Sequence, residues 1–184
     1  MRKIRHNREK RMLFLEIDRN EIYHSIKSEA YLYAQSLRLQ GKDMDLQSYI
    51  TDICEEQSKE RTARNLELSL ADVKVLISKL TRYPHPESAC LDNDYAHSVG
   101  NPDNNEEICI VLAVPPSFND AMAEPIYTYI CDYLVKKTIK YHLEMFFPEG
   151  AAVYETYAQT DAEKIHQYST VFIPGSLKLG QTMF

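Results

Sequence analysis

Several residue types are scarce in this chain of 184 residues, and each scarcity excludes a class of protein. Tryptophan is absent and glycine occurs only 5 times, so an all-β fold rich in tight turns is not favoured. The 4 cysteines are too few for a disulfide scaffold, and no two of them have a Cys-x-x-Cys spacing. We therefore expect reduced thiols and a domain that is stable through its own core.

Long apolar runs are missing as well. The basic start of the chain has the charge of a signal peptide, but only Met12 to Leu15 is continuously apolar there. A secretory signal needs ~7 to 15 apolar residues, and no stretch approaches the ~18 apolar residues of a membrane span. We therefore expect a cytoplasmic protein that does not contact a membrane.

Basic residues are gathered at the start of the chain, although the chain as a whole is acidic. The formal net charge is -6 at pH 7, yet residues 1–11 hold six Lys and Arg residues against one acidic residue. We interpret residues 1–17 as a flexible arm on an acidic body. Such an arm can contact phosphate groups or an acidic protein surface. The six basic residues are Arg2, Lys3, Arg5, Arg8, Lys10 and Arg11.

What remains is an ordinary globular composition, with 44% hydrophobic and 26% charged residues. The length favours one domain, and apolar periodicity predicts about five helices in a single domain over residues 18–169. The first, over 19–40, has Asp18 as its N-cap and Gly41 as its stop. The others are predicted from about 43, with a charged half at 55–64, from 69, from 119 or 120 to about 145, and from 148.

A short β element completes the predicted mainly helical fold. Residues 108–114 form a continuous apolar run that is rich in β-branched residues and ends at two prolines, which predicts a buried strand. Its expected partner is the segment 169–173 or a strand of another subunit. Residues 83–106 are predicted to form a long polar loop, and residues 170–184 an extended C-terminal tail.

The loop contains the residues that come nearest to a metal site. Five potential ligands lie within thirteen residues, and Cys109 follows at the predicted strand. Their spacing matches no standard zinc or calcium pattern. We interpret them as polar loop residues and keep a loop metal site as the alternative. The five residues are His85, Cys90, Asp92, Asp94 and His97.

No other motif predicts a reacting group. Residues 175–182 approach the phosphate-binding pattern Gly-x-x-x-x-Gly-Lys-Ser/Thr, but Gln181 stands at the lysine position. The motifs Gly-x-Ser-x-Gly, His-Glu-x-x-His and Gly-x-Gly-x-x-Gly do not occur. We therefore expect a protein without catalytic residues and without a bound cofactor.

Residues 69–184 combine a helix, a polar loop, a strand ending in Val114-Pro-Pro-Ser-Phe118, a long helix, a proline-initiated helix and an extended tail. This layout is similar to that of the neck or head-to-tail connector proteins of tailed phages and prophages. The resemblance implies a ring-forming structural subunit, cytoplasmic or virion-associated, that performs no reaction.

The function we expect is assembly with other protein chains, in a homo-oligomer. The apolar side chains of the tail are the expected contact residues, because apolar segments outside a core usually bury against a partner. These are Phe172, Ile173, Leu177, Leu179 and Phe184. The alternative is a small nucleic-acid-associated accessory or regulatory protein that uses the six basic residues of the arm.

Overall fold

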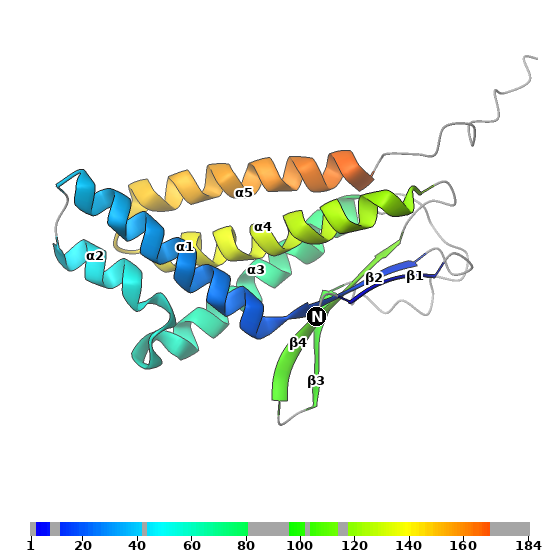
Figure 1. The fold of residues 1–184 in the computed structure, drawn as a ribbon, viewed down its shortest axis with the longest axis horizontal. Helices are drawn as coiled ribbons and strands as arrows, with labels where there is room; N and C mark the ends of the chain where they lie inside the picture. Colours follow the sequence, from blue (N-terminus) through cyan, green and yellow to red (C-terminus); the bar gives the residue numbers. More distant parts are fainter. Residues whose placement is uncertain are drawn as a thin grey trace, which may run out of the picture.

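The computed structural model describes residues 3–7, 12–41, 44–80, 96–101, 104–113 and 118–169 (Figure 1). The described part contains five α-helices and four strands, which confirms the predicted mainly helical fold. The helices are α1 (Arg19–Leu39), α2 (Met44–Thr51), α3 (Lys59–Leu80), α4 (Ala123–Leu143) and α5 (Pro148–Ser169). The strands are β1 (Lys3–Asn7), β2 (Met12–Asp18), β3 (Ala96–Asn101) and β4 (Asn104–Ala113).

The four strands form one antiparallel sheet in the order β1-β2-β4-β3. Alternate residues of β2 and β4 are buried, as expected for strands with one face against a core. The register places Leu15 opposite Ile110 and Ile17 opposite Ile108. Helices α1, α3 and α4 contact the strands. The buried layer of the sheet consists of Leu13, Leu15, Ile17, Ile108, Ile110 and Leu112.

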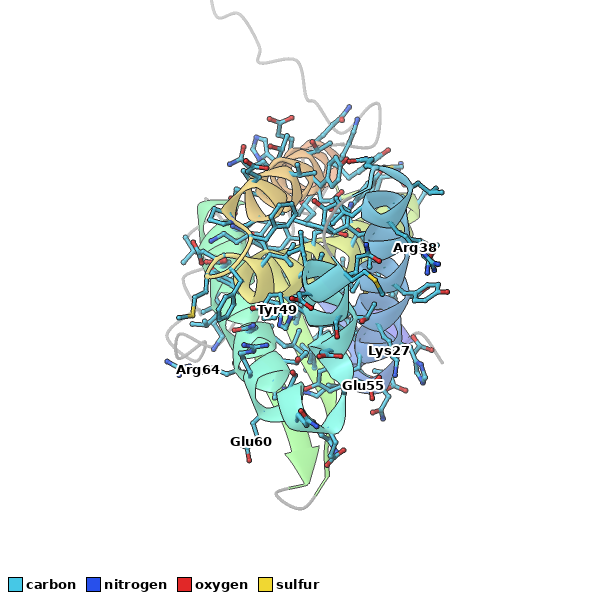
Figure 2. The ribbon with its side chains drawn as sticks, turned by 90° about the vertical axis from the view of Figure 1, so that its left-hand side faces the viewer. Lys27, Arg38, Tyr49, Glu55, Glu60 and Arg64 are labelled. Carbon is cyan, nitrogen blue, oxygen red and sulfur yellow. The ribbon has the colours of Figure 1, made fainter. Side chains whose placement is uncertain are left out.

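Residues 108–113 of the predicted strand 108–114 belong to β4, which begins earlier, at Asn104, and Val114 lies outside the described residues. β4 has β2 on one side and β3 on the other, so the predicted partner near 169–173 is corrected. Ser169 ends α5, and residues 170–173 lie outside the described residues. The predicted loop 83–106 is also interrupted by β3 and by the start of β4. The β3–β4 hairpin projects beyond the helices (Figure 1, Figure 2).

Residues of the predicted flexible arm form the other half of the sheet. Residues 3–7 are β1, and residues 12–17 belong to β2, which pairs with β4 along its whole length. These residues are part of the folded domain. The sequence signal for β2 is the alternation of Leu13, Leu15 and Ile17. Because Phe14 is also apolar, residues 12–15 form a continuous apolar run, and this run hides the alternation.

The ends of α1 follow the predicted signals. The Asp18 side chain accepts a hydrogen bond from the backbone N–H of Asn20 at 2.8 Å, which satisfies a donor at the start of the helix. Gly41 follows the C-cap residue Gln40 and has a φ of 72°. Glycine adopts this left-handed conformation without strain. The turn sets the direction in which the chain leaves α1 toward α2.

The boundary between α2 and α3 differs from the prediction. α2 ends at Thr51, two short 3-10 turns cover residues 52–58, and α3 begins at Lys59. Ser69, the predicted start of a helix, lies buried inside α3. Its hydroxyl lies 2.9 Å from the Asn65 carbonyl oxygen and 3.1 Å from Thr138 Oγ1. Because these partners satisfy the hydroxyl within a helix, a cap-forming residue does not mark a helix start here.

Helix α4 is the central helix, as its apolar composition predicts, and it contacts α1, α3 and α5. α5 begins at the predicted Pro148 and turns its buried stripe toward α4. That stripe includes Ala151, Tyr154, Ala158 and Ile165, and its alanines allow close approach. None of the helices in the described part of the chain has both the length and the apolar character needed to cross a membrane.

Candidate functional site: the apolar end of the helical bundle

Most of the predicted metal cluster lies outside the described residues, namely His85, Cys90, Asp92 and Asp94. His97 belongs to β3 and is the register partner of Cys109 on β4. Within the residues that the structure describes, no three His, Cys, Asp or Glu residues are grouped so that they could hold a metal ion. The loop metal site stays a prediction.

Only two of the predicted interaction residues lie in the part of the chain that the structure describes. Of the six basic residues, Lys3 and Arg5 lie in β1, and Arg2, Arg8, Lys10 and Arg11 lie outside the described residues. The contact residues of the tail also lie outside them, and both interactions stay predictions. These tail residues are Phe172, Ile173, Leu177, Leu179 and Phe184.

A cluster of charged side chains ties α3 and α5 to α4. Lys137 Nζ lies 2.7 Å from Glu155 Oε2 and 3.7 Å from Asp72 Oδ2. The Tyr141 hydroxyl donates to Asp72 Oδ2 at 2.6 Å. Burial raises the pKa of Glu155, but the hydrogen bond and the charge of Lys137 outweigh burial and hold this pKa below its ordinary value.

A second cluster joins α1 to α5 across α4. Lys136 Nζ lies 2.6 Å from Oδ2 of the buried Asp161. Burial raises the pKa of both Asp161 and Glu29, and the nearby Asp132 adds to this, while Lys136 lowers both pKa values. The cluster thus contains one ammonium group, that of Lys136, and three carboxylates, those of Glu29, Asp132 and Asp161, so its net charge is negative.

We interpret both clusters as connections within the fold. Each lysine is engaged by a carboxylate from another helix, whereas a nucleophilic lysine needs its amine free and neutral. The hollow of about 130 Å³ between α1 and α4 is smaller than the ~300 to 1,000 Å³ of small-molecule pockets. A wider hollow of about 500 Å³ is lined by α1 alone, so it is a surface depression.

Large apolar side chains are exposed at one end of the helical bundle. The last turn of α1, the start of α2 and the α4–α5 turn lie at this end, at the left of Figure 1. Leu39 is 90% exposed and Met44 and Met145 are each 80% exposed, the highest values among the large apolar side chains in the described part. Phe146 is 58% exposed. We name these four residues the apolar end.

The side chain of Tyr49, in α2, packs against the exposed ring of Phe146. The two rings meet edge to face with 4.7 Å between centroids, and the Tyr49 ring stacks on His142 at 4.6 Å. The Tyr49 hydroxyl donates to the His142 carbonyl at 2.5 Å, and His142 Nε2 lies 3.0 Å from the Tyr49 carbonyl oxygen. Figure 2 looks onto this end, with Tyr49 near its middle.

The α4–α5 turn is also held against α1. Tyr33 lies 6.4 Å from Phe147 and 5.2 Å from Tyr154, between ring centroids. Gly150 lies so close to Phe147 that an added Cβ would come within 2.5 Å of its Cε1 atom. Because such packing leaves the turn little freedom, Met145 and Phe146 stand on a fixed backbone.

Charged residues of opposite sign flank the apolar end. Arg38 is exposed in the last turn of α1. Glu144 and Glu149 are exposed on either side of the α4–α5 turn, and Glu144 accepts a hydrogen bond from Lys140 at 2.9 Å. In Figure 2, Arg38 lies at the right-hand edge and the α4–α5 turn (yellow) at the left. Arg64 also lies on the left in Figure 2, so this side carries charges of both signs.

The sequence analysis did not identify the apolar end. The available signal is weak: Met145 and Phe146 occupy a turn between two helices, where polar residues are usual. Leu39 and Met44 stand on either side of another turn. Nothing in the local sequence shows that the two turns lie at the same end of the bundle.

No protein family model matches this chain, and comparison with curated proteins and with solved structures gives no match. The fold and the site define a mainly helical protein with a small antiparallel sheet and an apolar end built from two helix turns.

Proposed function

We propose that the protein is a non-enzymatic assembly component that binds other protein chains through its apolar end. The observation that carries this proposal is that the most exposed large apolar side chains of the described part, Leu39, Met44 and Met145, belong to elements that end at the same end of the bundle. Single exposed apolar side chains are common on protein surfaces. A group of them with charged flanks is typical of an interaction site.

The energetics of the apolar end suit a binding surface. Full burial of a Leu, Met or Phe side chain contributes about 1.5 to 3 kcal/mol. Four such side chains together offset a large share of the about 4 to 15 kcal/mol that association costs. The remaining affinity has to come from contacts around the four residues, so the flanking charges matter for the choice of partner.

The connector-like layout of residues 69–184 supports the same class of function. Connector subunits act through contacts with neighbouring chains and perform no reaction. A phage or prophage origin, a cytoplasmic or virion-associated location, and contacts made by the tail residues Phe172 to Phe184 are the finer parts of this proposal.

A photo-crosslinking amino acid in place of Met145 tests the proposal. In the full chain, produced in its native cells, we expect it to form a covalent adduct with another protein chain, because Met145 would be buried in the contact. The matched control places the same amino acid at Leu32, which is 64% exposed on α1. Absence of adducts at position 145, or equal adducts at both positions, would contradict the proposal.

A further inference from the structure

Tyr49 and His142 join the short helix α2 to the central helix α4. The Tyr49 hydroxyl donates to the His142 carbonyl oxygen at 2.5 Å, and His142 Nε2 lies 3.0 Å from the Tyr49 carbonyl oxygen. The two rings are stacked, with 4.6 Å between their centroids and an angle of 20° between their planes. Each side chain is therefore bonded to the backbone of the other residue, and this reciprocal contact holds α2 against α4.

The reciprocal contact suits a neutral His142 ring and does not suit an imidazolium. His142 is 1% exposed, and its Nδ1 atom is buried without a hydrogen-bond partner among the described residues. Because Nε2 already donates to a carbonyl oxygen, an added proton has to bind at Nδ1. In the packed structure this would create a buried, charged N–H group without an acceptor, which is costly.

The charged groups that face His142 come from the elements packed around it. Arg61 of α3 lies 5.3 Å from the centroid of the Tyr49 ring, and Asp52 belongs to the 3-10 turn that follows α2. Burial lowers the pKa of His142 most strongly, the hydrogen bond to Tyr49 raises it, Arg61 lowers it and Asp52 raises it. The last turn of α4 favours a cation, yet the pKa of His142 lies below its ordinary value.

We propose that protonation of His142 releases α2 from α4, so that the Tyr49–His142 pair is a pH-sensitive switch. The added proton binds at Nδ1 once the ring has separated from Tyr49 and reached water. We expect α2 to be the element that moves, because Ile50 is the buried residue among its eight. Helix α4 is instead held by its contacts with α1, α3 and α5. Short elements with little buried surface are the first to open in folded proteins.

Release of α2 also changes the apolar end. Met44 lies on α2, and Phe146 packs against the Tyr49 ring. The surface offered to a partner therefore differs between the closed and the released state. This consequence rests on the proposed function, whereas the switch itself is a property of the chain alone and is measured without a partner.

The switch operates below pH 6.5, the ordinary pKa of histidine. The released state binds the proton more readily than the closed state, so the closed state predominates at neutral pH. Each pH unit below this value raises the ratio of released to closed molecules about tenfold, until the closed state also binds the proton. A variant with a weaker closed state therefore switches at a higher pH.

The first test is an NMR titration of the purified full chain from neutral to mildly acidic pH. We expect the ring signals of His142 and the backbone amide signals of α2 to change with one shared midpoint below pH 6.5, while the amide signals of β2 and β4 remain those of the folded protein. His142→Gln is the control, because its side-chain amide can still donate to the Tyr49 carbonyl oxygen but does not titrate. In this variant the α2 signals should not show the midpoint.

Three outcomes of this titration overturn the inference. The His142 ring could titrate while the α2 signals stay unchanged. The α2 signals could change at the same midpoint in His142→Gln. The whole chain could unfold in acid without an earlier change in α2.

The second test weakens the closed state directly. Tyr49→Phe keeps the aromatic ring and removes the hydroxyl that donates to the His142 carbonyl oxygen. Loss of one hydrogen bond weakens the closed state about two- to tenfold, so we expect the midpoint to rise by about 0.4 to 1 pH unit. Tyr31→Phe, the same change at a residue that is 55% exposed on α1, should leave the midpoint unchanged. Thermal melting confirms that both variants are folded, and an unchanged or lower midpoint for Tyr49→Phe overturns the inference.

Discussion

At the scale of single residues, His142 connects the apolar end to the core. It is 1% exposed, and the groups that face it are Tyr49, Arg61 and Asp52. Burial lowers the pKa of His142, and Arg61 lowers it further, against the hydrogen bond to Tyr49 and the charge of Asp52. Because a carbonyl oxygen only accepts, Nε2 carries a proton, and the lowered pKa favours the form in which Nδ1 carries none.

We expect the free energy of unfolding to decrease as the pH falls below about 6.5, the ordinary pKa of histidine. The pKa of His142 in the folded state lies below that value. Between the two pKa values the unfolded state binds a proton that the folded state does not, so stability is present above this window and is lost as the pH falls through it. Urea unfolding at several pH values measures the slope.

The control for this prediction is His142→Gln, because other groups titrate in the opposite direction. The pKa values of Glu29 and Asp161 are raised, so their contribution is present at low pH and is lost as the pH rises through their folded pKa values. The difference between wild type and variant isolates His142. The same pH slope in both proteins would refute the prediction.

At the scale of elements, the sequence predicts those helix ends that depend on residues close to them in the chain. α1 has Asp18 and Gly41 at its ends, and α5 begins at Pro148, so both helices are found. The boundary between α2 and α3 is not predicted correctly. Ser69 has the residue type of a helix N-cap, but it lies inside α3, where its hydroxyl is close to that of Thr138 on α4. The apolar end is missed for a related reason. Its two turns come to the same end of the bundle only once the helices have packed, and no local pattern encodes that arrangement.

The turns between α2 and α3 depend on Thr62. Its buried hydroxyl lies within hydrogen-bond reach of the carbonyl oxygens of Ile53 and Ser58, and its single proton is shared between them. Thr62→Val keeps the shape but leaves the Ile53 carbonyl without this donor, so we expect the free energy of unfolding to fall by about 1 to 3 kcal/mol. Thr160→Val, an exposed change on α5, should shift it by less than about 0.5 kcal/mol. Chemical denaturation that gives equal values for both would contradict this account.

At the scale of the whole molecule, Lys137 couples three helices. Its side chain is 11% exposed, and its partners Asp72 and Glu155 are 33% and 31% exposed. The helical bundle is therefore held together by a partly desolvated charge as well as by its apolar core. Removal of that charge takes the lysine partner away from both Asp72 and Glu155, which are partly desolvated carboxylates.

We expect Lys137→Met to lower the free energy of unfolding by roughly 1 to 2 kcal/mol, a value reduced for the partial exposure of both carboxylates. Lys140→Met, which removes the i,i+4 pair with the C-cap residue Glu144, whose side chain is 58% exposed, should cost less than about 0.5 kcal/mol. Thermal denaturation of the two variants measures the contrast. A smaller loss for Lys137→Met than for Lys140→Met would contradict the structural role of the cluster.

The order β1-β2-β4-β3 gives β1 and β3 a single strand neighbour each among the described residues. The sheet lies away from the apolar end (Figure 1), so a protein chain bound at the apolar end would leave the sheet uncovered. An assembly component that holds its partner at one pole in this way would keep the opposite pole for a further contact.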